Sequence, residues 1–303
     1  MQETFPIMLG AGAARRLAAL DSGHVLELVD AAGVVLLRGF DFDMGEFEAF
    51  TERMCDRFHE VGSRVRLRQH GDGYSAEVFR ENFTLLAHSE GCYRPWPPPP
   101  ELCFFCCITP PAASGGETTL VDGVRFAAGM PGPLRQRFLS AGVCYESQWE
   151  AERWRSEFQV GDVRALDRLL RDLPGVSYRI EDEALHIWYT TAALTPARSG
   201  ELAFANGVLA HLSRISHPGY REARVYARAT NHVYFGDGEE LGDEVINQLI
   251  DVHDGLVHRH RWQTLDLLLV DNTRFMHGRR MTDEPCERVL VSRFGRIRRA
   301  AAP

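Results

Sequence analysis

Residues 267–280 read Leu-Leu-Leu-Val-Asp-Asn-Thr-Arg-Phe-Met-His-Gly-Arg-Arg, and this stretch decides the fold. Its first four residues are apolar, which predicts a buried strand, and the polar residues after them predict a turn. The turn ends in His277. Because a neutral imidazole is a common metal ligand, a histidine that follows a buried strand is a candidate ligand inside a β-structure.

A second stretch, Leu86-Ala-His88-Ser-Glu90, offers two more candidate ligands. A histidine and a glutamate two apart on a strand point to the same face. With His277 they would present two imidazoles and one carboxylate to a metal, the ligand set of non-haem iron(II) oxygenases. Taken alone the pair is a weak signal, since 12 histidines and 42 acidic residues produce it by chance. The alternative is a strand histidine beside an exposed glutamate.

Two further residues suit a 2-oxo acid cosubstrate, whose distal carboxylate needs an arginine fork and a hydroxyl donor. Thr118 follows a Gly-Gly-Glu turn, and Arg288 opens an apolar strand eleven residues after His277. Arg293 is the alternative to Arg288. It lies an odd number of residues further on, so it should face the opposite side of a regular strand. A plain turn and a solvated arginine are the ordinary interpretations.

The composition excludes several classes of function. Acidic residues number 42 and basic residues 34, a net charge of −8, which argues against nucleic-acid binding and a polybasic membrane anchor. None of the basic residues is lysine, so a lysine Schiff base and a Walker A loop are excluded. No run approaches the ~20 apolar residues of a membrane helix. The first residues lack a signal-peptide pattern, and we expect a cytoplasmic protein whose oligomeric state the sequence leaves open.

The seven cysteines are dispersed and predict no disulfide framework. Cys103, Cys106 and Cys107 share one apolar run. A zinc site would need a second pair at matching spacing, which the chain lacks. We therefore expect these cysteines to be buried in a strand.

Strand and helix patterns do not alternate along the chain, which disfavours a parallel doubly wound sheet. Apolar runs predict strands at His24–Val29, Gly33–Gly39, Leu102–Ile108, Val225–Phe235, Leu265–Val270 and Arg288–Phe294. Helical periodicity predicts helices at Phe47–Glu60, Pro133–Ala141, Val163–Leu173 and Gly242–Leu256. The expected architecture is mainly β with helices, a sandwich or barrel. We expect a single domain over residues 1–303, with a helical or irregular insertion within about residues 125–215.

Two other classes of function have some support in the sequence. Gly10-Ala-Gly12 follows an apolar run, and Asp30 lies 20 residues after Gly10, as in a dinucleotide-binding fingerprint. The third glycine is replaced by Arg15, and no further βα units follow, so an N-terminal strand, a turn and a short helix fit better. The remaining alternative is a barrel that binds a ligand without turnover.

Several further short motifs follow one another along the chain. They are Gly33–Phe40 with Phe47 and Phe50, His88–Tyr93, Trp96-Pro97, Phe104–Cys106, Gly115–Thr118 with Asp122, Gly142–Tyr145, Gly200-Glu201, Phe204–Asn206, Phe235–Gly238, Trp262-Gln263, Asp266, Asp271-Asn272 and His277–Arg279. In order and spacing they resemble the taurine-dioxygenase-like superfamily of iron(II)/2-oxoglutarate oxygenases. Within it they resemble the branch of the syringomycin-pathway aspartyl hydroxylase and related natural-product amino-acid oxygenases. Two departures are Leu265-Asp266, where the family often has Gly-Asp, and a sparse match between Arg125 and Tyr234.

The resemblance implies a distorted double-stranded β-helix, a variant of the jelly roll. It implies iron(II) bound by His88, Glu90 and His277, with Thr118 and Arg288 binding the carboxylate of 2-oxoglutarate and with dioxygen as the second cosubstrate. Halogenating relatives replace the carboxylate ligand by a small residue. Glu90 therefore implies hydroxylation, or a related desaturation or epoxidation.

The resemblance also implies an amino-acid substrate, free or tethered to a carrier protein. Candidate substrate contacts are Asn82, Asn206 and Arg293. Asn82 lies six residues before His88, so strand parity would place both on one face.

Overall fold

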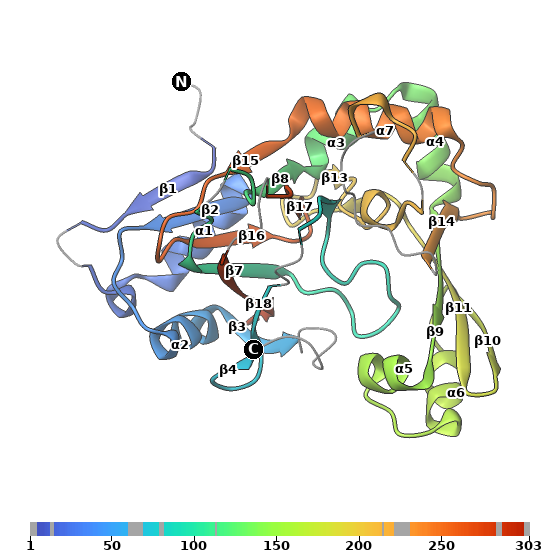
Figure 1. The fold of residues 1–303 in the computed structure, drawn as a ribbon, viewed down its shortest axis with the longest axis horizontal. Coiled ribbons are helices and arrows are strands. Elements are labelled where there is room, and N and C mark those ends of the chain that lie inside the picture. Colours follow the sequence, from blue (N-terminus) through green and yellow to red (C-terminus); the bar gives the residue numbers. More distant parts are fainter. Residues whose placement is uncertain are drawn as a thin grey trace.

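The computed structural model describes residues 5–12, 15–59, 69–78, 82–112, 114–213, 215–220, 231–282 and 287–299. Two sheets, together called the barrel, face each other across an apolar interior, and a second region extends from them (Figure 1). This is the mainly β protein with helices that the sequence predicts. No helix in the described ranges is long and apolar enough to cross a membrane.

The larger sheet has eight strands drawn from both ends of the chain. Its order is β1 (Ile7–Gly10), β2 (Val34–Arg38), β16 (Leu267–Asp271), β7 (Leu102–Thr109), β18 (Val289–Ile297), β5 (Ser75–Glu77) and β4 (Gln69–His70), and β3 (Cys55–His59) also pairs with β18. Strand β16 is hydrogen-bonded on both edges, to β2 and to β7. Both of its faces are buried, because Leu267 and Leu269 pack toward the helices and Leu268 and Val270 pack into the barrel. A continuous apolar run rather than an alternating one is therefore required there.

The smaller sheet carries most of the candidate site. Its order is β15 (His258–His260), β8 (Thr118–Asp122), β17 (Phe275–Arg279) and β6 (Leu85–His88), and all of its pairings are antiparallel. Leu120 and Phe275 point into the barrel, where they meet Phe105 and Phe294 of the larger sheet. Thr118 and His277 share the alternation of these two residues and so belong to the interior face.

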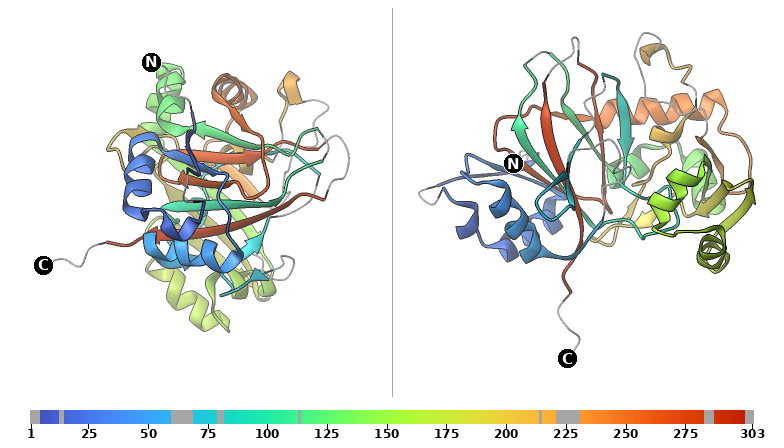
Figure 2. Two further views of the ribbon diagram at one scale, coloured as in Figure 1. Left: turned by 90° about the vertical axis from the view of Figure 1, so that its left-hand side faces the viewer. Right: turned by 60° about the horizontal axis from the view of Figure 1, so that its bottom comes forward.

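The described helices are η1 (Leu17–Ala19), α1 (Ser22–Ala32), α2 (Met44–Met54), α3 (Gly123–Gly129), α4 (Gly132–Ala141), α5 (Ala151–Phe158), α6 (Val163–Arg171), η2 (Leu209–His211), η3 (Pro218–Tyr220) and α7 (Asp243–Leu256). Helices α1 and α2 cover the outer face of the larger sheet, and α3 and α7 cover that of the smaller sheet (Figure 2). The predicted helices at Pro133–Ala141, Val163–Leu173 and Gly242–Leu256 are confirmed within two residues. The helix predicted at Phe47–Glu60 instead ends at Met54 and continues as β3.

The predicted strand at His24–Val29 is wrong, because these residues belong to α1. The Asp21 side chain accepts a hydrogen bond from the Gly23 amide and caps the helix, which ends at Gly33 with φ of 80°. Val25 and Val29, four residues apart, are the buried face. Asp30 therefore lies in a helix, where it pairs with Arg198, and not at the strand end that a dinucleotide fingerprint requires.

A compact region, here called the lobe, comprises residues 143–191 and projects at the lower right of Figure 1. It contains β9 (Val143–Trp149), α5, α6, β10 (Val176–Glu181) and β11 (Ala184–Thr191). Its sheet has the order β10-β11-β9-β14, with β14 (Asn231–Phe235) supplied from later in the chain, and a short pair, β12 (Thr195–Pro196) with β13 (Leu202–Ala203), follows it. The predicted strand Val225–Phe235 is described only from Asn231 onward. The lobe thus places a sheet, besides helices, within residues 125–215.

The cysteines behave as the sequence predicts. Cys103, Cys106 and Cys107 are buried in β7 as free thiols, and no disulfide links the described cysteines. Burial raises the pKa of Cys106 to about 12, so this thiol is a packing group rather than a reactive one. Cys286 lies outside the described residues.

Candidate active site

His88 and Glu90 are held at the mouth of the barrel by a turn. The sequence predicted that both residues lie on one strand. His88 is instead the last residue of β6, and Glu90 lies in the turn beyond it. Asn272 holds this turn from the far end of β16: its side-chain oxygen accepts from the Glu90 amide at 2.8 Å, and its Nδ2 donates to the Glu90 carbonyl at 3.0 Å. The Ser89 hydroxyl donates to the Asn272 carbonyl at 2.6 Å. Hydrogen bonds to Asn272 therefore fix the backbone of the turn that carries the carboxylate.

The sequence predicted that His277 ends the turn after the buried run; it is instead the middle residue of a strand, β17. It pairs with His88 across the β6–β17 ladder, and the two ring centroids lie 4.6 Å apart. The Phe105 ring packs 4.9 Å from the His277 ring on the barrel side. The ladder and the phenyl ring together fix the imidazole.

The three candidate ligands converge. One possible ligand atom from each of His88, Glu90 and His277 lies within 4.8 Å of the others, and these three are the metal-binding group found among the described residues. His88 Nδ1 lies 3.2 Å from the Leu86 carbonyl, which leaves Nε2, 3.8 Å from Glu90 Oε2, as the ligand atom. Nδ1 of His277 is buried without a hydrogen-bond partner. An incomplete polar set of this kind fits a divalent cation.

The ionisation states also suit a metal. Burial, helped by the neighbouring His88, lowers the pKa of His277 to about 3, so its imidazole is neutral at physiological pH. Burial opposes ionisation of Glu90, but the contact with His88 and the charges of His88 and Arg94 outweigh it and lower the pKa of this carboxyl to about 2. A neutral imidazole and an ionised carboxylate are the forms that bind iron(II).

The two predicted cosubstrate residues lie near each other at the start of β8. Arg288 is buried immediately before β18, and its Nη1 donates to the Gly116 carbonyl at 3.0 Å. Thr118, two residues after Gly116, is buried with its side chain on the interior face. Its hydroxyl accepts a hydrogen bond from Trp262 Nε1 at 3.1 Å. The structure therefore brings the predicted arginine fork and hydroxyl into one corner of the barrel.

Arg293 lies on the other face of β18, as the strand parity predicts. It is fully buried on the side where Val291 packs toward the helices. Its guanidinium stacks 3.8 Å from the Phe58 ring centroid and binds Asp72 at 2.7 Å and Glu52 at 3.3 Å. The opposite orientation of the two arginines is confirmed.

The two predicted asparagines make contacts within the protein. Asn82 lies before β6, and its side-chain oxygen accepts from the amide of Thr282 at 2.8 Å and from its hydroxyl at 3.0 Å. Strand parity with His88 therefore does not apply to it. Asn206 Nδ2 donates to the Ala193 carbonyl, and its backbone carbonyl accepts from Ser89, next to the metal turn.

The sequence patterns assigned no role to three residues around the metal turn, although Asn272 lies in one of the motifs that carry the resemblance. Asn272 is one, and the others are Arg94 and His59. Arg94 is buried beyond Glu90, forms an ion pair with Glu157 of α5 and keeps an unpartnered, buried Nε. Burial, together with the nearby positive charge of Arg94, lowers the pKa of His59 to about 4. Since Glu157 lies in the lobe, no local pattern around Arg94 could have identified its partner.

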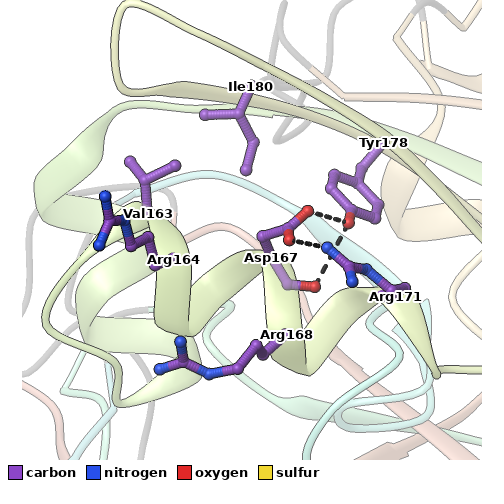
Figure 3. Close-up of a pocket in the computed structure, with 7 residues that line it drawn as sticks. All are labelled: Val163, Arg164, Asp167, Arg168, Arg171, Tyr178 and Ile180. Carbon is purple, nitrogen blue, oxygen red and sulfur yellow. Dashed lines mark hydrogen bonds and ion pairs between the residues drawn. The ribbon is translucent and has the colours of Figure 1, made fainter.

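A separate hollow of about 570 Å³ lies on the lobe between α6 and β10 (Figure 3). In it the Tyr178 hydroxyl donates to Asp167 at 2.6 Å, and Arg171 pairs with the same carboxylate. None of the predicted ligands lines this hollow, so it does not compete with the barrel mouth as a candidate active site.

Comparison with known proteins then decides the family. The family model "Taurine catabolism dioxygenase TauD, TfdA family" matches residues 10–293. The chain belongs to the TauD/TfdA family. No curated protein matches the sequence.

Solved structures of similar fold agree with this membership. The chain is similar to the PvcB protein of Pseudomonas aeruginosa, with 15% identity, coverage of 97% of this chain and 90% of that one, and a TM-score of 0.56. It is also similar to a putative α-ketoglutarate-dependent 2,4-D dioxygenase from Burkholderia xenovorans (18%, 98% and 96%, 0.56) and to a taurine dioxygenase from Burkholderia xenovorans (12%, 96% and 86%, 0.58). At these identities the likeness concerns the fold alone, and it confirms the double-stranded β-helix.

This TauD/TfdA-family chain is a 2-oxoglutarate-dependent non-haem iron dioxygenase. Bound iron(II), with 2-oxoglutarate and dioxygen, supplies the oxidising power of such reactions. His88, Glu90 and His277 would hold the metal, and three ligands of this kind leave positions for a cosubstrate. Phe105 and the apolar barrel interior exclude water on one side of the metal ligands, and Asn272 fixes the backbone at Glu90.

Proposed function

We propose that this dioxygenase hydroxylates an amino acid, free or tethered to a carrier protein, in a natural-product pathway. The observation that carries the reaction type is Glu90, whose ionised carboxylate points into the group formed with His88 and His277. A carboxylate at this position occupies the place that a halide would need. Desaturation or epoxidation by the same metal site is the second candidate reaction.

The amino-acid part of the proposal is supported by the motif resemblance to the syringomycin-pathway hydroxylase branch. It is also supported by Arg94 beside the metal turn, which keeps a buried Nε without a hydrogen-bond partner although another of its nitrogens pairs with Glu157. A buried donor on a guanidinium suits a carboxylate such as that of an amino acid.

Thr118 and Arg288 bind the distal carboxylate of 2-oxoglutarate in this proposal. Their support is the shared corner at Gly116 and Thr118, with Arg288 fully within the protein. Asn82, Asn206 and Arg293 stay predictions of substrate contact, and the whole chain acts as one oxygenase domain.

The test is a panel of free amino acids, each also as its carrier-protein thioester, with iron(II) and 2-oxoglutarate. We expect one amino acid to raise succinate formation and to gain one oxygen atom by mass spectrometry. Loss of two hydrogens would favour desaturation instead. Succinate formation that no amino acid stimulates, while a non-amino-acid substrate does, would contradict the proposal. In the Glu90→Ala variant we expect hydroxylation to be lost without halogenation, even with added chloride, because the surrounding residues also tune the metal.

A further inference from the structure

Trp262 makes one specific contact with the predicted cosubstrate corner. Its indole Nε1 donates a hydrogen bond to the Thr118 hydroxyl oxygen at 3.1 Å, and both side chains are buried. No hydrogen bond donated by the Thr118 hydroxyl occurs within the described ranges. An indole can only donate, whereas a hydroxyl can accept and donate at once. The hydroxyl proton of Thr118 is therefore available to donate a hydrogen bond to a group other than Trp262.

The indole packs beside a buried polar cluster that joins β15 of the smaller sheet to β2 of the larger one. Trp262 follows β15, whose last residue, His260, pairs with Thr118 in the ladder between β15 and β8. The imidazole of His260 and the indole of Trp262 pack edge to face, with ring centroids 4.5 Å apart. His260 lies 3.5 Å from the fully buried Asp266, which the Arg38 guanidinium grips through both carboxylate oxygens at 2.7 and 2.6 Å. The Gln263 amide adds a further hydrogen bond to Asp266. A ring braced in this way cannot easily turn its N–H away from Thr118.

We propose that Trp262 is a positioning residue for the cosubstrate: by donating to Thr118, it makes that hydroxyl donate to the distal carboxylate of the 2-oxo acid. The inference rests on the proposed role of Thr118. Without the indole N–H, the hydroxyl could turn its own proton toward other acceptors, and the carboxylate would face a lone pair part of the time. Arg288 would still supply the charge, so Trp262 tunes recognition and is not itself a contact of the carboxylate.

The test is Trp262→Phe, which keeps an aromatic ring in the barrel and removes only the donor. We expect the half-saturating concentration of 2-oxoglutarate to rise roughly 3- to 10-fold, the value of one neutral hydrogen bond, with little change in the maximal rate. The decisive comparison uses 2-oxopentanoate as a competitive inhibitor, because a methyl group replaces its distal carboxylate. Its inhibition constant should stay within twofold of the wild-type value. If both constants weaken equally, Trp262 merely fills space, and the proposal is wrong.

Two further variants make the outcome unambiguous. In a Thr118→Val background, Trp262→Phe should add less than a twofold effect, because the hydroxyl through which it acts is gone; independent effects would contradict the proposal. Trp154→Phe is the matched control. It removes another buried indole hydrogen bond, 2.7 Å to the Glu183 carbonyl in the lobe, and should leave the 2-oxoglutarate dependence unchanged. If Thr118→Val alone leaves the 2-oxoglutarate dependence unchanged, the assignment of Thr118 to the cosubstrate site is wrong. If Thr118→Val raises the half-saturating concentration strongly and Trp262→Phe does not change it, only the role of Trp262 is wrong.

Discussion

The barrel and the lobe are assembled in opposite ways. The lobe's own core consists of Trp149, Trp154, Phe158, Leu166, Leu170, Leu185 and Ile187, all from one continuous segment. The barrel's neighbouring strands β2, β16, β7 and β18 come from both ends of the chain (Figure 1). Local contacts close loops at low entropic cost, and distant ones do so at a higher cost. The metal site therefore forms only when the whole barrel has closed, whereas the lobe is a local unit attached to the barrel.

The largest expected difference between the two regions concerns a histidine in each. We expect His277→Ala in the barrel to abolish succinate formation, because losing a ligand exceeds the 10- to 100-fold loss typical for a group that merely orients one. The imidazole packs on Phe105 and His88, so we also expect a stability loss of ~1 to 3 kcal/mol. His186→Ala in the lobe removes a 2.6 Å contact with Glu146 and should leave turnover within twofold. Turnover and urea unfolding of both variants check this; equal activity losses would break the comparison.

The next prediction separates two arginines of one strand. Arg288→Gln should raise the 2-oxoglutarate concentration needed by roughly 30- to 5,000-fold, the range for a truncated buried charge pair of ~2 to 5 kcal/mol. Arg293→Gln should leave that concentration unchanged and instead lower stability, because Arg293 binds Asp72 and Glu52 behind the sheet. The measurement is the 2-oxoglutarate dependence of succinate formation, together with urea unfolding. A large loss of cosubstrate affinity in Arg293→Gln alone would mean that the two arginines exchange roles.

The ion pair between Arg94 and Glu157 tests how firmly the lobe is attached to the metal turn. Only 8% and 13% of these side chains are exposed, so Glu157→Gln leaves a buried cation without its counter-charge. We expect a stability loss of ~2 to 4 kcal/mol, somewhat below the cost of breaking a fully buried pair. Glu183→Gln is the matched control, because the pair of Arg155 and Glu183 is far more exposed and should contribute ~0 to 1 kcal/mol. Similar losses for both variants in urea unfolding would show that the lobe contact is no tighter than a surface pair.

The smallest effect concerns acid sensitivity of the barrel. Since burial lowers the pKa of His59 to about 4, the unfolded chain binds this proton more tightly than the folded one. The stability that His59 contributes is complete above its unfolded pKa of ~6.5 and is lost as the pH falls toward 4. We expect the metal-free protein to lose ~1 to 2 kcal/mol more between pH 7 and 5 than its His59→Gln variant does. Identical pH dependence of the two proteins in urea unfolding would contradict this.

Features that depend on local residue patterns were predictable before the structure was known. Four consecutive apolar residues before Asp271 are required of a strand buried on both faces, so β16 was predictable. The alternation rule placed Arg288 and Arg293 on opposite faces, and the His-x-Glu motif with a distant histidine supplied the metal ligands. The alternation rule needs only residue type and spacing, whereas the metal ligands also needed the order of the other motifs along the chain, because a single His-x-Glu pair is a weak signal. The same apolar pattern misled at His24–Val29, where a cap at Asp21 and the four-residue spacing of Val25 and Val29 make a helix.

The contacts that hold these features in place join residues far apart in the chain. The metal turn is aimed by Asn272, which lies 182 residues after Glu90, and is joined to the lobe through Glu157. Trp262 reaches Thr118 across 144 residues. The lobe sheet needs β14 from beyond its own segment. Partners so distant along the chain leave no periodic signal, because a hydrogen bond or an ion pair depends on where the closed chain places two groups and not on the residues beside them.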